Sequence, residues 1–194
     1  MSARCPWAGN DDLMVDYHDK EWGFPVYDDR VLFEFIILEG CQAGLSWSTV
    51  LKKRENYRKA FDNFDAVKIA RYRQKKIDTL LNNPGIIRNK LKVNAAVKNA
   101  RGFLDIQKEF GSFAKYIWSF TENKPIVNKW KTLKEMPAET ELAKTISKDL
   151  KKRGFSFVGP TIIYSFMQAV GIVNDHLISC PQHKEVQKYY KRLK

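Results

Sequence analysis

Residues 31–39 are the most constraining segment of the sequence, because VLFEFIILE has the character of an apolar helix and leads directly into the glycine-containing segment 40–47. Side chains three and four apart share one helix face, so Glu39 falls on the same side as Phe35 and Ile36. A carboxylate there should be buried or line a pocket. Unpartnered burial costs on the order of several kcal/mol or makes the group take up a proton. Glu39 is therefore a candidate for chemical work; the alternative is a helix-end glutamate that reaches solvent.

Helical signals dominate the rest of the chain, and strand patterns are weak throughout. The apolar positions of the longest amphipathic stretch are expected in the core: Leu91, Ala95, Val97, Ala100, Phe103 and Leu104. The polar, proline-bearing region 122–140 is expected to be an irregular surface connection. The expected helices are one that starts at Asp28-Asp29 and carries Glu39, one over 47–61, one capped by Asp65, a long one over about 88–110, and one from about 141 to 153.

The charge of the chain indicates an anionic partner. The 34 Lys and Arg against 22 Asp and Glu give a formal net charge of +12, in the range expected for nucleic-acid binders. A membrane surface is the competing interpretation, but the longest apolar runs contain glutamates and are too short to span a bilayer. The first residues have no apolar core followed by a cleavage site, so we expect a cytoplasmic protein.

Two cysteines and two histidines near the chain ends form a candidate metal set. Cys5 precedes His18 by thirteen positions, and His176 precedes Cys180 by four, a spacing that predicts one helical face for the second pair. Structural zinc favours four such ligands, and binding it could tie the two ends together. The alternative is a buried small thiol and a core histidine with a satisfied hydrogen bond. Cys41 has no matching partner and is expected to be a core thiol.

Residues 150–162 contain a basic helix end, a glycine turn and a new helix that begins at Pro160 or Thr161. Free amides at a helix start attract anions, and preceding basic residues add positive charge. The segment can therefore be a phosphate-binding hairpin. The alternative interpretation is a simple turn between two helices, with the Lys-Lys-Arg side chains in solvent.

Five segments together resemble the 3-methyladenine DNA glycosylase I family over roughly residues 3 to 180. The resemblance implies an all-α helix-hairpin-helix DNA glycosylase fold, with the hairpin element near 145–170. It also implies that structural zinc, one per chain, is held by Cys5, His18, His176 and Cys180. The segments are 17–23 (YHDKEWG), 38–47 (LEGCQAGLSW), 52–57 (KKRENY), 151–155 (KKRGF) and 173–176 (VNDH).

The resemblance also implies how the chain is divided. A terminal zinc-binding domain would consist of residues 1–29 and 171–194, and a helical barrel domain of residues 30–170. The DNA-binding cleft would lie between them, with double-stranded DNA containing alkylated bases as the partner. The protein is expected to be a monomer.

The implied activity is DNA repair: base flipping and hydrolysis of the N-glycosidic bond of 3-methyladenine, which leaves an abasic site. Glu39 is expected to discriminate the damaged base, with Tyr17 and Trp47 in the same pocket and Trp7 and Trp22 as possible further walls. No lysine stands out as a Schiff-base nucleophile, which indicates a monofunctional enzyme. The residues expected to contact DNA are Gln42, Gly44, Leu45, Phe157, Gly159 and Thr161.

Two departures from the wider superfamily bear on mechanism. Residues 155–159 read Phe-Ser-Phe-Val-Gly where the superfamily hairpin reads Leu-Pro-Gly-hydrophobic-Gly. Asn174 stands where the superfamily has a catalytic aspartate, and Asp175 is adjacent. Alkylation at N3 leaves the nucleoside positively charged and already weakens the glycosidic bond, so less acid catalysis is required.

A noncatalytic, zinc-stabilised protein that binds damaged DNA is the alternative function. It would need the basic surface and the hairpin. A carboxylate in an apolar pocket would give such a protein no obvious advantage, so Tyr17, Glu39 and Trp47 together favour the enzyme.

Overall fold

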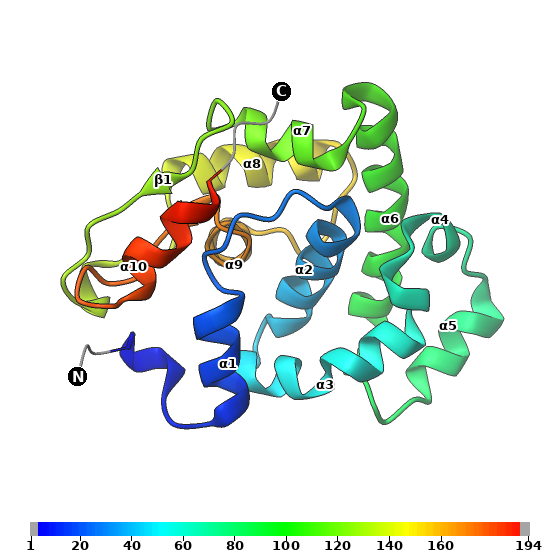
Figure 1. Ribbon diagram of the computed structural model, residues 1–194. Helices are drawn as coiled ribbons and strands as arrows, with labels where there is room; N and C mark the ends of the chain where they lie inside the picture. Colours follow the sequence, from blue (N-terminus) through cyan, green and yellow to red (C-terminus); the bar gives the residue numbers. More distant parts are fainter. Residues whose placement is uncertain (1–3, 191–194) are drawn as a thin grey trace.

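The computed structural model describes residues 4–190, and this part of the chain is helical apart from two short strands (Figure 1). The elements are η1 (Pro6–Ala8), α1 (Asp12–Lys20), α2 (Asp29–Gln42), α3 (Trp47–Ala60), η2 (Asp62–Phe64), α4 (Ala66–Ile69), α5 (Gln74–Leu81), α6 (Lys90–Phe110), α7 (Phe113–Ser119), β1 (Ile126–Val127), η3 (Leu133–Glu135), α8 (Glu141–Lys152), α9 (Pro160–Ala169), β2 (Val173–Asn174), α10 (Gln182–Glu185) and η4 (Val186–Tyr189). The helix starts expected at Asp28, Asp65 and Pro160 are confirmed.

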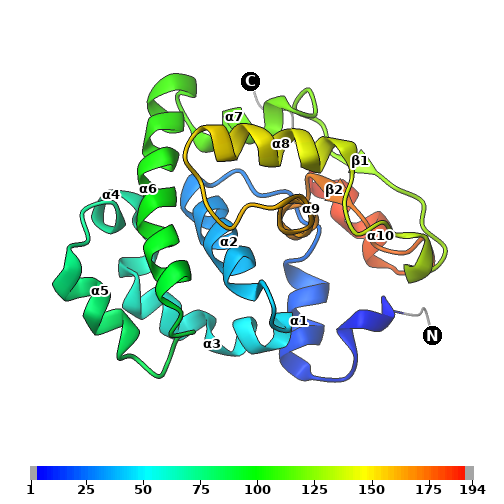
Figure 2. The same ribbon diagram turned by 180° about the vertical axis from the view of Figure 1, so that it is seen from behind.

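Helix α2 lies at the centre of the molecule and packs against α3, α6, α7 and α9 (Figures 1 and 2). Every residue from Leu32 to Cys41 is buried, as expected of a helix that is apolar on all sides. The Asp28 side chain caps its start by accepting a hydrogen bond from the Val31 amide at 3.0 Å. This burial places Glu39 inside the protein.

The expected inner face of α6 is largely confirmed, with Ala95, Val97, Ala100 and Phe103 buried. The prediction for Leu91 is wrong, because its side chain is 70% exposed. Leu91 belongs to the first turn of α6, before Val93, the first buried residue of the helix. Leu91 therefore matches the apolar periodicity of α6 but is not part of the core.

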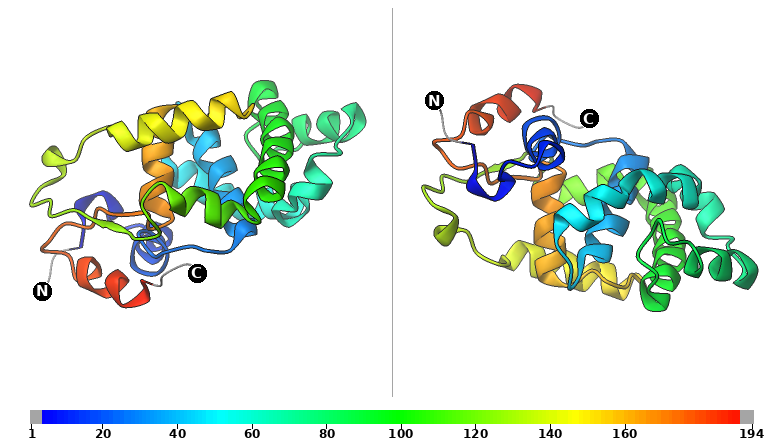
Figure 3. Two further views of the ribbon diagram at one scale, coloured as in Figure 1. Left: turned by 90° about the horizontal axis from the view of Figure 1, so that it is seen from above. Right: turned by 90° about the horizontal axis from the view of Figure 1, so that it is seen from below.

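The N-terminal elements η1 and α1 lie with the C-terminal elements α10 and η4 on one side of the molecule, away from α4 and α5 (Figure 3). Strands β1 and β2 pair in parallel, with Ile126 opposite Val173, so the irregular connection expected over 122–140 lies against the C-terminal segment. The helical placement of His176 and Cys180 is wrong, because the chain leaves β2 in a series of turns. Those turns, rather than one helix face, bring the two side chains together.

Near the C-terminus, residues 182–189 form α10 and η4, and Val186 is fully buried. Residues 1–3 and 191–194, which the expected terminal domain includes, lie outside the described residues. Among residues 4–190, no helix is both long and apolar enough to cross a membrane.

Candidate functional site

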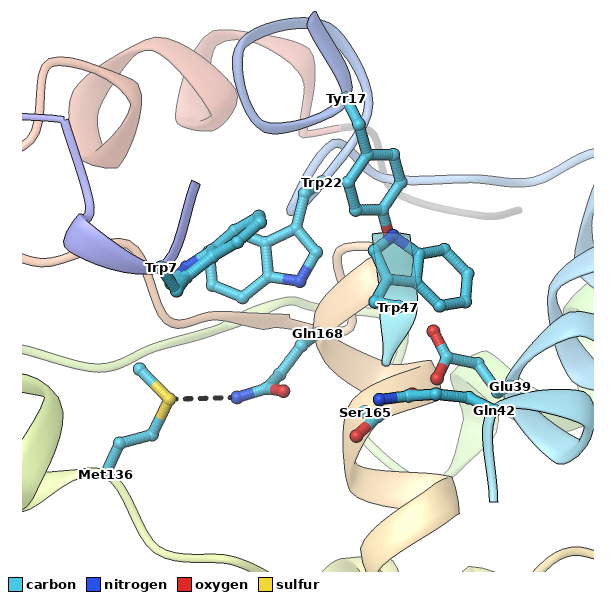
Figure 4. Close-up of a pocket in the computed structure, with 9 residues that line it drawn as sticks. All are labelled: Trp7, Tyr17, Trp22, Glu39, Gln42, Trp47, Met136, Ser165 and Gln168. Carbon is cyan, nitrogen blue, oxygen red and sulfur yellow. Dashed lines mark hydrogen bonds between the residues drawn. The ribbon is translucent and has the colours of Figure 1, made fainter. Parts of the chain in front are cut away.

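A cavity of about 170 Å³ lies between the N-terminal elements, the end of α2 and α9 (Figure 4). All five residues expected to form a base pocket line it, although they come from four separate parts of the chain. Helix α1 supplies Tyr17, α2 supplies Glu39, and Trp47 begins α3. The full lining is Trp7, Tyr17, Trp22, Glu39, Gln42, Trp47, Met136, Ser165 and Gln168.

Glu39 is the acidic group of this cavity. Its side chain is 3% exposed, and one carboxylate oxygen, Oε2, is buried without a hydrogen-bond partner in the described part of the chain. Burial raises the pKa of Glu39 from 4.5 to about 8. The carboxyl group is therefore largely protonated in the empty cavity at neutral pH, and a cation or hydrogen-bond donor placed beside it would favour the charged form.

The raised pKa predicts a dependence of stability on pH. The carboxyl group ionises near pH 4.5 in the unfolded chain but near pH 8 in the folded one, so its contribution is fully present below pH 4.5 and is lost as pH rises to 8. Glu39→Gln removes this dependence and should make the protein about 2–5 kcal/mol more stable than the parent at pH 8. Denaturant unfolding of both proteins between pH 5 and 8 measures the difference in their free energies of unfolding. A difference that stays constant with pH contradicts a raised pKa of Glu39.

Aromatic rings form the walls of the cavity. Tyr17 and Trp47 lie 5.2 Å apart between ring centroids, and Trp7 meets Trp22 edge-on at 4.9 Å. The indole nitrogen of Trp47 is buried and, among the described residues, has no partner. Burial, together with the nearby Glu39, raises the pKa of Tyr17 well above its usual value, so its hydroxyl keeps its proton. The walls therefore offer flat apolar faces and two hydrogen-bond donors.

Sequence reasoning did not identify three of the lining residues, Met136, Ser165 and Gln168. Ser165 and Gln168 lie three positions apart on α9 and so share a face, which is the one signal that could have suggested them. Met136 follows η3 in the irregular connection. The Gln168 amide nitrogen contacts the Met136 sulfur at 3.1 Å and donates to Asp175 Oδ2 at 2.8 Å, which turns its oxygen toward the cavity (Figure 4).

Asn174 and Asp175 do not line the cavity. The Asn174 side chain is fully buried and donates to the His183 carbonyl oxygen at 2.9 Å. Asp175 accepts four hydrogen bonds, from the side chains of Asn128, Trp130, Tyr164 and Gln168. The Asn174 side chain therefore bonds within the C-terminal segment, and Asp175 joins that segment to its neighbours.

A second cavity, of about 190 Å³, shares Glu39, Gln42 and Ser165 with the first and continues to the turn after α2. Four of the six residues expected to contact DNA line it: Gln42, Gly44, Leu45 and Thr161. Gly44 has φ +78°, a conformation that favours glycine, and Leu45 is 41% exposed. The turn thus holds an exposed apolar side chain beside the entrance to the base pocket.

The segment 154–159 connects α8 to α9, as expected. Phe157 has φ +57°, a backbone conformation that glycine would adopt more easily. Gly159 is the N-cap of α9. Arg153 is not free for phosphate, because it pairs with Glu109 at 2.6 Å and Asp149 at 2.7 Å, whereas Lys151 and Lys152 are exposed.

The four candidate metal ligands come together at the chain ends. Cys5, His18, His176 and Cys180 are all buried, and their ligand atoms lie within 4.8 Å of one another. Sulfur–nitrogen separations are 3.7 Å from Cys5 Sγ to His176 Nδ1, 3.7 Å from Cys180 Sγ to His18 Nε2, and 3.8 Å from Cys180 Sγ to His176 Nδ1. Tetrahedral zinc with bonds of about 2.3 Å to sulfur and about 2.0 Å to nitrogen requires roughly 3.5–3.8 Å, so the residues fit zinc.

The outer hydrogen bonds of the two histidines agree with this fit. His18 Nδ1 lies 2.6 Å from the Asp19 carboxylate, and His176 Nε2 lies 2.9 Å from the Trp22 carbonyl oxygen. Each ring therefore has an acceptor on its far side and presents its other nitrogen to the cluster. Metal-bound histidines in proteins are usually oriented in this way.

Comparisons with known proteins agree on one family. A family model described as methyladenine glycosylase matches residues 7–183. The DNA-3-methyladenine glycosylase of Haemophilus influenzae is 53% identical over 93% of this chain and 98% of its own length, and DNA-3-methyladenine glycosylase 1 of Escherichia coli is 50% identical over 91% and 95%.

Solved structures give the same result for the fold. A crystal structure of 3-methyladenine DNA glycosylase I superposes with a TM-score of 0.90 at 50% identity, covering 92% of this chain and 98% of that one. The Staphylococcus aureus enzyme, described with the structural basis of its 3-methyladenine recognition, gives 0.91 at 38% identity, covering 94% and 97%.

Proposed function

The chain belongs to the methyladenine glycosylase family, its activity is that of a DNA-3-methyladenine glycosylase of base-excision repair, and we propose that the cavity around Glu39 receives the flipped base. The observation that carries this assignment is a buried carboxyl group with one unpartnered oxygen in an aromatic-walled cavity. A buried polar group without a partner is costly, so such a group in a cavity is best explained by a ligand that completes its hydrogen bonds.

Glu39 distinguishes the alkylated base from normal adenine. Its oxygens can accept hydrogen bonds from the exocyclic amine, and its ionised form favours a cationic nucleoside over a neutral one. Trp47 can stack on the base with a cation–π contribution of about 0.5–2 kcal/mol. Tyr17 supplies a protonated hydroxyl, and Trp7 and Trp22 close the far side of the cavity.

The chemistry requires little acid catalysis, since the alkylated base leaves from a nucleoside that is already positively charged. This agrees with the positions of Asn174 and Asp175, neither of which lines the cavity. Among the described residues that line the cavity none is a lysine, as expected of a hydrolase that forms no Schiff base.

Double-stranded DNA is proposed to lie across the turn 42–45 and the segment 155–159, which acts as a helix-hairpin-helix element between α8 and α9. Leu45 would fill the gap left by the flipped nucleotide and offset part of the unstacking cost, a few kcal/mol per step. Free amides at the start of α9, next to Gly159 and Thr161, would bind phosphate. The net charge of +12 favours the same partner.

Zinc is proposed to be structural. Cys5, His18, His176 and Cys180 would supply all four ligands, which leaves no open position for water. Bound there, the ion contributes folding free energy and joins the two chain ends into one terminal domain beside the helical barrel.

Release of free base from methylated duplex DNA tests the function. Rapid, selective release of 3-methyladenine over 7-methylguanine and adenine is expected, without strand cleavage and without a borohydride-trapped adduct. Chromatography of the released bases and gel analysis of the strand measure both. Binding to methylated DNA without release would instead identify a noncatalytic damage-binding protein.

A further inference from the structure

Helix α6 contacts both segments that are proposed to face DNA, although it contributes no residue to the base pocket (Figure 2). The two segments are the turn 42–45, which follows α2, and the hairpin 155–159, which connects α8 to α9. They are more than a hundred residues apart in the chain. Their relative position must therefore be set by contacts with the rest of the fold.

The first contact is made by Lys92. Its Nζ atom donates to the Cys41 carbonyl oxygen at 2.7 Å and to the Ala43 carbonyl oxygen at 2.7 Å. These carbonyls belong to the last turn of α2 and to the turn itself, where a helix leaves acceptors without partners and carries partial negative charge. Lys92 is half-buried, so a charged group is partly withdrawn from water to hold this backbone.

The second contact is made by Asn99, two helical turns further along α6. Its amide nitrogen donates to the Ser156 carbonyl oxygen at 2.9 Å, and its amide oxygen accepts from the Ser156 amide at 2.8 Å. Asn99 is 2% exposed, so both bonds are shielded from water. Residues seven apart lie on nearly the same face of a helix and are separated by about 10 Å along its axis.

Close packing completes the arrangement. A Cβ atom added at Gly40, on α2, would lie 3.2 Å from the Phe157 Cβ and 3.3 Å from its carbonyl oxygen. One added at Gly102, on α6, would lie 2.7 Å from the Phe155 ring. The end of α2, the hairpin and α6 therefore meet with no space for an additional carbon atom, which restricts sliding of one segment past another.

We propose that Lys92 and Asn99 are positioning residues that hold the turn 42–45 and the hairpin 155–159 at a fixed separation on one rigid helix. The inference rests on the proposed function, because it concerns how the two segments bind one DNA duplex at the same time. A fixed separation lets the hairpin bind backbone while Leu45 enters the stack, without ordering either segment during binding.

The test separates DNA engagement from the base pocket. Lys92→Met removes both bonds to the end of α2 and the turn after it, and Asn99→Asp removes the bond donated to the hairpin. Single-turnover release of 3-methyladenine from methylated duplex should fall at least about tenfold in each variant. The affinity for free 3-methyladenine, measured by tryptophan fluorescence, should stay within about twofold of that of the unaltered protein, because neither residue lines the base pocket. Lys92→Arg keeps the charge and the donors and should recover most of the release.

Matched controls lie on the same helix. Lys108→Met removes a charge from a residue whose side chain is 78% exposed, and Asn94→Asp removes a side-chain bond to the Lys90 carbonyl oxygen of α6 itself. Both substitutions should leave the rate of 3-methyladenine release within about twofold of that of the unaltered protein. The double variant Lys92→Met/Asn99→Asp should be little worse than the poorer single variant, since the two residues maintain one geometry.

Three outcomes overturn the inference: unchanged release in both single variants, an equal loss of free-base binding, or a double variant whose loss is the product of the single losses. Failure of the proposed function is distinguishable, because the unaltered chain itself would then release no 3-methyladenine. Asn99→Asp keeps the test decisive if Lys92→Met does not fold.

Discussion

Replacing Glu39 with glutamine is expected to reduce the rate of 3-methyladenine release about 10- to 150-fold, while affinity for undamaged DNA changes little. Glutamine has nearly the same shape but cannot become negative, so the pocket loses its charge-assisted hydrogen bond to a cationic base, worth about 1.5–3 kcal/mol. Because Glu39 lies inside the protein, no contact to undamaged duplex is removed. Single-turnover release and binding to unmodified duplex measure the two effects.

A matched control for that variant is Glu141→Gln, at a side chain on α8 that is 89% exposed. It removes the same charge from the protein surface and should leave both measurements unchanged. Equal losses of release and DNA affinity in Glu39→Gln, or no loss in either, would count against the role assigned to the buried carboxyl group.

Removal of the metal is expected to have the largest effect on stability. One zinc ion per chain should be found after gentle purification, and Cys180→Ser should lose it together with several kcal/mol of stability. Zinc binding by small domains contributes on the order of 10 kcal/mol at neutral pH. The loss of stability should be smaller here, because the hydrophobic core of this protein also stabilises the fold. Metal analysis and thermal unfolding, with and without a chelator, measure both.

Cys41→Ser is the matched control, because Cys41 is also buried but lies outside the cluster. It places a hydroxyl group in the same kind of environment and should keep one zinc ion per chain. Gently purified parent protein without metal, or a Cys180→Ser variant that unfolds at the same temperature as Cys41→Ser, would refute a structural zinc site.

The parts of the site that depend on one continuous helix were predictable from the sequence. Periodicity placed Glu39 on the face of Phe35 and Ile36 while leaving a solvent-reaching helix end open, and the structure buries it with every residue from Leu32 to Cys41. Met136 and Gln168 enter the cavity through a parallel strand pair and a contact to Asp175, and neither interaction has a local signal. Family resemblance was needed to bring Trp7 and Tyr17 together with Trp47.

Spacing was misleading where backbone conformation overrode it. The four-residue separation of His176 and Cys180 is helical in character, yet β2 precedes them and turns place their side chains. Leu91 fits the apolar period of α6 but is exposed to solvent. Periodicity predicts which face of a helix is apolar, but it does not predict how far along the helix that face is buried.

The cluster of two cysteines and two histidines also has a consequence for the order of folding. It joins His18 to Cys180 and Cys5 to His176, pairs that are 162 and 171 residues apart in the chain. Contacts of such sequence separation carry a large loop-closure cost and form late. The ribosome produces Cys5 and His18 first, so these two ligands must wait for nearly the whole chain. During that interval the central helices can collapse, and the cavity that Trp7 and Trp22 help to line is expected to form only when the N-terminal and C-terminal segments meet.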